Sequence, residues 1–163
     1  MHMEDEIIRE YRPEDREAVD RCVFELQEDE SMRQPEYWQT GKKSVEDGYL
    51  DYLLKRVNSH NGKLLVAEVN GAVVGFVSVL IENEKDASPC VKMKHAGYVP
   101  ALAVLREYQK RGIGKRLLEA AEQYVKSQGC EYLALDVTTD NLAHDFYKKL
   151  GYREFTVNMM KKL

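Results

Sequence analysis

Several features that define whole classes of protein are missing from this chain of 163 residues. No apolar run approaches the roughly 20 residues that a membrane-spanning helix requires. The first residues lack the basic and then apolar pattern of a secretory signal. Positive charge is not in excess either, because the net charge is −4, and this argues against a general nucleic-acid binder. We therefore expect no membrane and no nucleic acid among its partners.

Cysteine and histidine are also scarce. The three cysteines, Cys22, Cys90 and Cys130, are far apart, odd in number and fit no metal spacing. No pair among the four histidines has the spacing of metal ligands. We expect no disulfide framework and no metal site, with Cys22 and Cys130 serving as packing residues. These features are typical of a reduced, cytoplasmic setting.

What is present is an ordinary globular composition, with 44% hydrophobic and 32% charged residues. The length predicts one domain over residues 1–163. Apolar periodicity predicts helices from Pro13, after Ser44, over about 113–128 and over about 140–150, and irregular structure over 28–44 and 83–95. Strands are predicted at 6–11, 63–69, 72–82, 96–105, 132–137, 152–155 and 157–163. This order predicts an α+β fold, in which a mixed, mostly antiparallel sheet has helices on both faces.

Two local signals refine this order. Asn70-Gly71 lies between two β-branched runs and predicts a type I′ hairpin. Pro100 lies inside the strand predicted at 96–105, and proline has no N–H to donate to a sheet. We therefore expect the ladder to break or bulge at Pro100.

The most informative stretch is residues 101–126, where a short apolar strand runs into a basic glycine turn and then a long helix. Ile113, Leu117, Ala121 and Val125 recur every fourth position and predict one buried face. Amides in the first turn of a helix lack partners, and with the helix dipole they attract anions. Basic residues crowd the same turn: Arg106, Lys110, Arg111, Lys115 and Arg116. The turn is interpreted as a pyrophosphate site, although Gly-x-Gly at such a junction is also common in plain tight connections.

Two motifs here resemble those of a known family. Gln109-x-x-Gly112-x-Gly114 after Leu102-Ala103-Val104 is similar to the acyl-CoA signature of the GNAT superfamily of N-acetyltransferases. A second run resembles its downstream landmark: Asn141-x-Ala143-x-x-Phe146-Tyr147-x-x-Leu150-Gly151-Tyr152. The resemblance implies a six- to seven-stranded sheet flanked by about four helices. It also implies acetyl-CoA as cosubstrate, and direct transfer of the acetyl group to a primary amine without a metal.

The resemblance also assigns roles to individual residues. Backbone amides of Gln109, Lys110, Arg111, Gly112, Ile113 and Gly114 would bind the diphosphate, with Lys115 nearby. Leu102, Ala103 and Val104 would pair with the pantetheine arm as an added strand. Asn141 would contact the same arm, or serve only as a helix cap. Tyr147 would protonate the departing thiolate, or be an ordinary core tyrosine at the rim of the site.

The base and the acceptor are less well specified. Many family members carry a glutamate on the strand at 96–105, where this chain has Tyr98-Val99-Pro100-Ala101. Glu82, Asp136 or an ordered water could take the proton instead. The acidic residues of 28–44 would favour a cationic amine acceptor, or simply form a solvated loop. A homodimer is possible because terminal elements often support dimers in this family.

Two other classes of function remain open. The missing glutamate motivates a non-catalytic acyl-CoA-binding or regulatory module on the same fold. The glycine turn alone motivates an unrelated phosphate- or nucleotide-binding domain.

Overall fold

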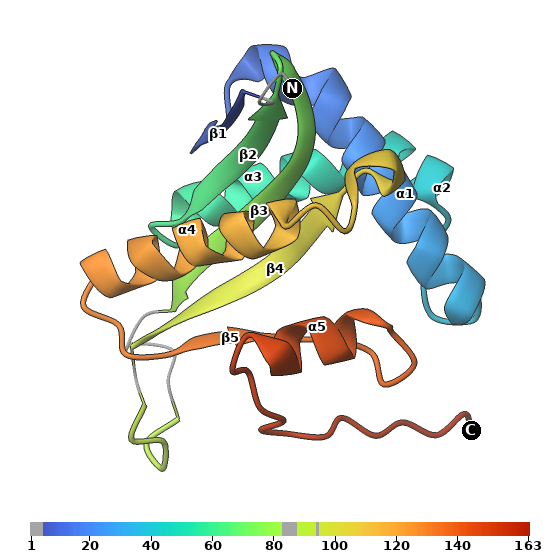
Figure 1. The fold of residues 1–163 in the computed structure, drawn as a ribbon. Helices are drawn as coiled ribbons and strands as arrows, with labels where there is room; N and C mark the ends of the chain where they lie inside the picture. The colour runs from blue at the N-terminus through green and yellow to red at the C-terminus, as the bar shows by residue number, and fades with distance from the viewer. Residues whose placement is uncertain (1–4, 83–87, 94) are drawn as a thin grey trace.

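The computed structural model describes residues 5–82, 88–93 and 95–163, and its described strands form one five-stranded sheet (Figure 1). The strands, in sheet order, are β1 (Glu6–Glu10), β2 (Lys63–Val69), β3 (Ala72–Glu82), β4 (Ala96–Val104) and β5 (Leu133–Leu135). Neighbouring strands are antiparallel except β4 and β5, which are parallel. The predicted α+β class is confirmed, with fewer strands than expected.

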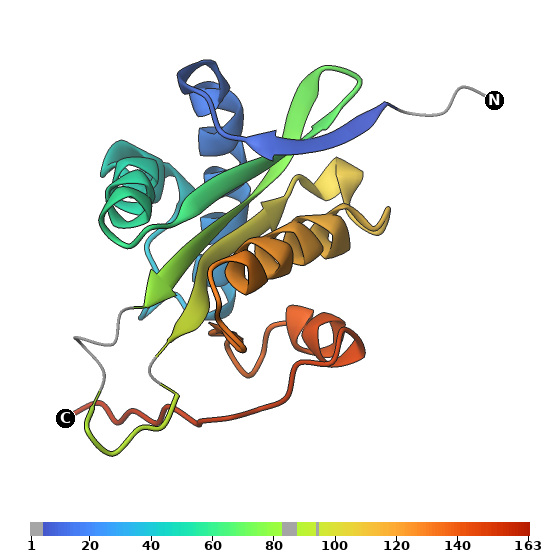
Figure 2. The ribbon, with the colours of Figure 1, turned by 90° about the vertical axis from the view of Figure 1, so that its left-hand side faces the viewer.

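Helices cover both faces of this sheet (Figures 1 and 2). One face carries α1 (Arg16–Arg33), α2 (Gly41–Glu46) and α3 (Tyr49–Ser59). The other face carries α4 (Ile113–Ser127), and α5 (Ala143–Lys149) lies on the same side beyond β4. No helix among the described residues is long and apolar enough to cross a membrane.

The core lies on both sides of β3 and β4. The predicted stripe of α4 is confirmed, since Ile113, Leu117, Ala121 and Val125 are all buried. Cys22 and Cys130 are buried packing residues as expected, and all three cysteines are free. Packing of α4 against the sheet fixes where its N-terminus lies.

The hairpin and the bulge form where they were predicted. Asn70 and Gly71 both have positive φ, 49° and 84°, as a type I′ turn requires, and Val69 pairs with Ala72. In β4, Ala101 pairs with Ser78 and Tyr98 with Leu80, so two residues of β4 face one of β3. The extra residue lies at Val99-Pro100, which confirms the bulge.

The bulge also reverses which side chains of β4 face α4. A methyl group placed on Gly97 would clash with Val125 of α4, so Gly97 faces that helix. A methyl group placed on Gly114 of α4 would lie 3.8 Å from Val104 Cγ2, so Val104 also faces that helix. Two strand residues seven positions apart normally point to opposite faces. The extra residue at the bulge puts both on the face of α4.

Three helix boundaries were predicted wrongly. Residues 28–33 continue α1 as helix, because Glu28, Asp29 and Glu30 find partners within and beside it. The second helix begins at Gly41, where the Thr40 hydroxyl accepts the Lys43 N–H at 3.2 Å, and not after Ser44. It then stops, since Gly48 has φ 79° and separates α2 from α3.

The end of the chain also differs from expectation. Residues 152–163 form no strand, so the predictions at 152–155 and 157–163 are wrong, and β5 has three residues instead of six. Residues 83–87 and 94 of the loop predicted at 83–95 lie outside the described residues, and 88–93 form neither helix nor strand.

Candidate active site

The glycine turn exposes the first amides of α4. Lys110 and Gly112 both have positive φ, 62° and 82°, and Gly112 is the residue that precedes the helix. The first backbone hydrogen bond of α4 runs from Arg116 N–H to the Gly112 carbonyl at 3.1 Å. The amides of Ile113, Gly114 and Lys115 therefore lie ahead of the helical hydrogen-bond ladder, in the geometry that binds anions.

Most of the basic side chains at this turn already contact protein groups. Arg116 forms ion pairs through two nitrogens with Glu6 of β1, and Arg106 pairs with Asp29 of α1. Arg111 donates to the Glu107 carbonyl at 3.0 Å. Lys115 Nζ lies 3.8 Å from Glu119 Oε1, one turn along α4. The arginines therefore fix the turn to its surroundings, and the backbone remains the main anion-binding feature.

The second feature is an open edge of β4. The pairing with β5 covers only Gly97 to Val99. The Leu105 N–H points the other way, to the Val74 carbonyl of β3 at 2.9 Å. Because backbone direction alternates along a strand, the peptide groups of Leu102 and Val104 point to the uncovered edge. An extended chain could add there by main-chain hydrogen bonds.

Gln109 closes part of this edge. Its side-chain amide donates to the Val104 carbonyl at 2.9 Å. A carbonyl oxygen has two lone pairs, so this bond leaves the Val104 carbonyl able to accept one more. The first residue of the glycine motif is thus tied to the last residue of the open edge.

The two sequence motifs meet in space. A methyl group on Gly114 would lie 3.6 Å from Phe146 Cζ of α5 and 3.8 Å from Val104 Cγ2. The strand, the turn and the downstream landmark therefore surround one place, at the N-terminus of α4. About 30 residues of sequence separate the two motifs, so this proximity depends on the fold.

Tyr147 follows Phe146 on α5, and its ring is largely buried. Its ring packs edge-on against Phe146 and Tyr152, with centroid distances of 5.2 and 5.9 Å. Burial raises the pKa of Tyr147 to about 12, and the negative charge of Glu30 adds to the shift. The hydroxyl therefore keeps its proton at neutral pH.

Asn141 lies just before α5, whose N-cap residue is Leu142. The Asn141 Oδ1 accepts the N–H of Ala143, the first residue of the helix, at 2.9 Å. The Asn141 Nδ2 donates to Glu30 Oε1 of α1, also at 2.9 Å. Both ends of the amide are thus engaged by the protein, and contact with a pantetheine arm stays a prediction.

The candidate bases differ in position. Tyr98 of β4 donates to Asp136 Oδ2 at 2.6 Å, directly beside the bulge. Glu82 pairs with Ala96, which is four residues before Pro100. Glu82 therefore lies roughly 13 Å from the bulge along the strand direction. Sequence reasoning gave Tyr98 no role, although it lies on the strand where the family resemblance implied a glutamate. Burial, and then its bond to Asp136, raises the pKa of Tyr98.

The acidic residues near the end of α1 are mostly engaged. Glu28 accepts the Gly41 N–H at 2.7 Å, and Asp29 pairs with Arg106. Glu30 contacts Arg33 and Asn141 through Oε1 only. Among the described residues, four buried polar atoms have no partner: Glu30 Oε2, Arg33 Nε, Trp38 Nε1 and Thr138 Oγ1. Their residues come from the end of α1, the segment after it and the connection from β5 to α5.

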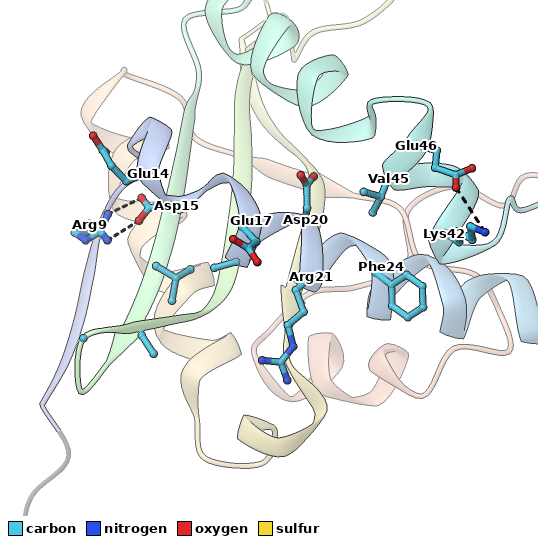
Figure 3. A pocket seen from close by; sticks show the side chains of 14 residues that line it. Arg9, Glu14, Asp15, Glu17, Asp20, Arg21, Phe24, Lys42, Val45 and Glu46 are labelled. Atoms are coloured by element: carbon cyan, nitrogen blue, oxygen red, sulfur yellow. Dashed lines mark hydrogen bonds and ion pairs between the residues drawn. The ribbon is translucent and has the colours of Figure 1, made fainter.

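A depression of about 840 Å³ lies elsewhere, between the start of α1, α2 and the tip of the β2–β3 hairpin (Figure 3). Arg9 and Asp15 form two parallel hydrogen bonds at one end of it, at 2.7 and 2.8 Å. No residue of either motif lines this depression. The site therefore rests on the glycine turn and the open edge of β4.

Comparison with known proteins agrees with this geometry. Residues 23–152 match the model of the acetyltransferase (GNAT) family. An N-alpha-acetyltransferase of Sulfurisphaera tokodaii is 35% identical over 112 residues, which are 65% of this chain and 65% of that protein. An uncharacterized N-acetyltransferase of Bacillus subtilis, YhfO, is 31% identical over 64% of this chain and 68% of its own length.

Solved structures share the fold. A point mutant of the BH1408 protein from Bacillus halodurans superposes with a TM-score of 0.84 and 21% identity, over 96% of this chain and 99% of that one. The aminoglycoside N-acetyltransferase AAC(6')-Iy in complex with CoA gives 0.70 at 18% identity, over 99% and 97%. The family model matches most of this chain, residues 23–152, and both motifs lie at one place in the fold. The chain therefore belongs to the GNAT acetyltransferase family.

Proposed function

We propose that this protein transfers an acetyl group from acetyl-CoA to a primary amine. Two binding features that lie close together carry the proposal. One is the first amides of α4, which have no hydrogen-bond partner among the described residues, and the other is the edge of β4 at Leu102 and Val104, which no described strand covers. A diphosphate and an extended amide-containing arm are the parts of CoA that these features fit. Membership of the acetyltransferase family supports the same cosubstrate.

The glycine turn would hold the diphosphate. Amides of Ile113, Gly114 and Lys115 supply donors, and the left-handed conformation of Gly112 lets the backbone turn toward them. Lys110 and Lys115 add positive charge. The peptide groups of Leu102 and Val104 would hold the pantetheine arm, and this directs its end along β4 toward the bulge.

When bound, acetyl-CoA supplies a thioester carbon that an unprotonated amine can attack, and the sulfur then leaves. Tyr147 would donate a hydrogen bond to that sulfur. Its pKa of about 12 exceeds that of an ordinary thiol, about 8.5, by roughly 3 to 4 units. Full transfer of the proton to the free thiolate is therefore uphill by about 5 kcal/mol. Tyr147 acts best by sharing its proton as negative charge develops on the sulfur.

Asp136 is our choice for accepting the ammonium proton, directly or through a water. It lies beside the bulge, whereas Glu82 is several residues away along the sheet. The Tyr98 hydroxyl occupies one oxygen of Asp136 and leaves the other able to accept. Replacing Asp136 by asparagine would then lower turnover most at low pH, where fewer amines are already deprotonated.

A cationic acceptor is supported by Glu30. Its Oε2 is a buried carboxylate oxygen without a partner among the described residues, and such an atom is costly unless a donor occupies it. Arg33 and Asn141 hold the other oxygen, so the free one has a fixed position. An ammonium group near Tyr147 would satisfy it. The N-alpha-acetyltransferase relative supports an α-amine as the acceptor class.

The test is an acetylation assay with acetyl-CoA and a panel of amines that includes peptides with free N-termini, polyamines and aminoglycosides. Thiol release with at least one amine is expected. CoA binding without turnover on any amine would favour the binding-module alternative, and stabilisation by ATP but not CoA would contradict the proposal. Glu30→Gln should raise the acceptor KM about tenfold or more without changing CoA affinity. Glu36→Gln, which changes an exposed carboxylate in the neighbouring segment, is the matched control.

A further inference from the structure

One side of α3 carries a row of aromatic residues and an arginine. Tyr49, Tyr52 and Arg56 lie three and then four positions apart, which places them on the same side of the helix. The Tyr49 and Tyr52 rings are stacked, with a centroid distance of 6.0 Å. Tyr98 of β4 completes the row, because the Arg56 guanidinium lies 5.7 Å from the Tyr52 ring and 5.9 Å from the Tyr98 ring. A cation is thus held between two aromatic rings.

Arg56 has no acidic partner in the part of the chain that the structure describes. Its side chain makes the two ring contacts and a long hydrogen bond, 3.4 Å, to the Tyr52 hydroxyl. A guanidinium carries five N–H donors, so most of them are unused. None of the Arg56 nitrogens is among the buried polar atoms without a partner, so the unused donors are accessible to solvent. Arg56 can therefore bind a ligand without giving up an ion pair.

This state is unlike that of most arginines in the chain. Six others form ion pairs with carboxylates of the protein: Arg9, Arg16, Arg21, Arg33, Arg106 and Arg116. Rings on either side restrict the motion of the Arg56 guanidinium and leave its N–H groups available. The planar fork of a guanidinium matches a carboxylate, which accepts two parallel hydrogen bonds from it.

The position of Arg56 relates this cation to the proposed reaction. Tyr98, whose ring Arg56 contacts, donates its hydroxyl to Asp136 Oδ2 at 2.6 Å. Arg56 and the proposed base therefore contact the same tyrosine, which lies next to the bulge in β4. Tyr52 is 53% exposed, so this row is open to an entering molecule. An amine at Asp136 could thus have an acidic group of its own at Arg56.

We propose that Arg56 binds a carboxylate of the acceptor, so that the preferred acceptor carries an acidic group a few bonds from the reacting nitrogen. The inference rests on the proposed function and narrows its acceptor from any cationic amine to a zwitterion. The carboxylate is either the acidic side chain of a peptide's first residue or the α-carboxylate of a free amino acid, since a guanidinium recognises the same group in both. Polyamines and aminoglycosides have no carboxylate and would leave Arg56 unused.

Acceptor binding to the protein saturated with CoA tests the inference without turnover. Two pairs of probes differ only in the carboxylate: an amidated tripeptide that begins with aspartate against one that begins with asparagine, and leucine against leucinamide. In one pair the acid should bind about tenfold more tightly or better by calorimetric titration, and that pair identifies the source of the carboxylate. Arg56→Gln should abolish the preference, with CoA affinity and melting temperature unchanged. Lys55→Gln removes a neighbouring exposed cation of α3 and should keep the preference.

The acetylation assay on the same pairs separates this inference from the proposed reaction. The acid should have a kcat/KM about tenfold above that of its amide in the wild type, and the two should be equal in Arg56→Gln. Acetylation without a preference for either acid, or a preference that survives Arg56→Gln, would overturn the inference and leave the reaction standing. Acid binding that depends on Arg56 without any acetyl transfer would support the carboxylate site and contradict the reaction.

Arg56→Lys is a second variant in case Arg56→Gln does not fold. It keeps the positive charge but loses the planar fork, so it should lower the preference for the acid about threefold or more. An unchanged preference in a folded Arg56→Lys would mean that the guanidinium does not bind the carboxylate.

Discussion

Replacing Gly112 by alanine tests the turn on which the proposed cosubstrate site depends. Gly112 has φ 82°, a left-handed conformation that an alanine adopts at a cost of about 1–2 kcal/mol. The added methyl group would also lie 2.9 Å from Arg116 Nη1, which is the far end of a flexible side chain and can shift. Most of the cost therefore comes from the backbone. The variant should melt about 2–8 °C below the wild type.

Gly114→Ala is the matched control two residues away. A methyl group there would meet Phe146 and Val104 at 3.6 and 3.8 Å, which are ordinary contact distances. Since alanine is the better helix former, this variant should be as stable as the wild type or more stable by about 0.5–1 kcal/mol. Each variant adds one methyl group to the wild type, and their free energies of unfolding should differ from each other by about 1.5–3 kcal/mol.

Coenzyme A affinity separates stability from function. Gly112→Ala should weaken binding about tenfold or more, because a turned amide no longer points at the diphosphate. Gly114→Ala should bind as the wild type does. Calorimetric titration and thermal melting measure both effects on the same samples. Equal stability of the two variants would refute the left-handed turn. A destabilised Gly112→Ala that binds coenzyme A normally would refute the diphosphate assignment.

Three further outcomes are expected. Tyr147→Phe should lower kcat at least tenfold with little change in coenzyme A affinity, measured by thiol release and titration. Asp15→Asn should lower the free energy of unfolding by about 3 kcal/mol at pH 7. The Arg9 hydrogen bond lowers the pKa of Asp15 in the folded protein below its ordinary value of 3.8. The difference in unfolding free energy between the wild type and Asp15→Asn is therefore complete above pH 3.8, and it disappears as the pH falls through the pKa of Asp15 in the folded protein. Urea unfolding at several pH values measures this dependence. Ser78→Ala should lower the free energy of unfolding by about 1–3 kcal/mol. The buried Ser78 hydroxyl accepts the Ala101 N–H at 3.2 Å, at the place where the bulge interrupts the ladder. An unchanged stability would mean that water replaces the hydroxyl.

Local sequence rules sufficed where one residue type determines the backbone. Asn70-Gly71 requires two positive φ values, and Pro100 cannot donate to a ladder, so the hairpin and the bulge were predictable. The stripe of α4 was predictable because its apolar residues repeat with the helical period over four turns. The meeting of the two motifs was expected only through the family resemblance.

Long-range partners explain most of the errors. Glu28 and Asp29 look like loop residues in the sequence, but Gly41 and Arg106 supply partners that keep α1 helical to Arg33. The apolar alternation of Phe155, Val157 and Met159 predicted strands that the structure does not form. A local pattern of this kind does not show which strand edge the segment would pair with. Glu30 was seen only as one member of an acidic segment, since its contact with Asn141 spans 111 residues.

The bulge at Val99-Pro100 connects these observations into one arrangement. Before it, Tyr98 lies on the face of α3, where the Arg56 guanidinium is 5.9 Å from its ring. After it, Val104 faces α4, and Leu102 shares that face by alternation. A cosubstrate held by the peptide groups of Leu102 and Val104 would lie along the open edge of β4 after the bulge, whereas the Tyr98–Asp136 pair lies before it. Deleting Pro100 would leave Gly97 and Val104 six positions apart, so both would still face α4 and the pairing of β4 with β3 would become regular. A folded variant of this kind therefore removes the irregular backbone without moving side chains to another face. We expect it to bind coenzyme A, and a loss of turnover would assign a role to the bulge itself.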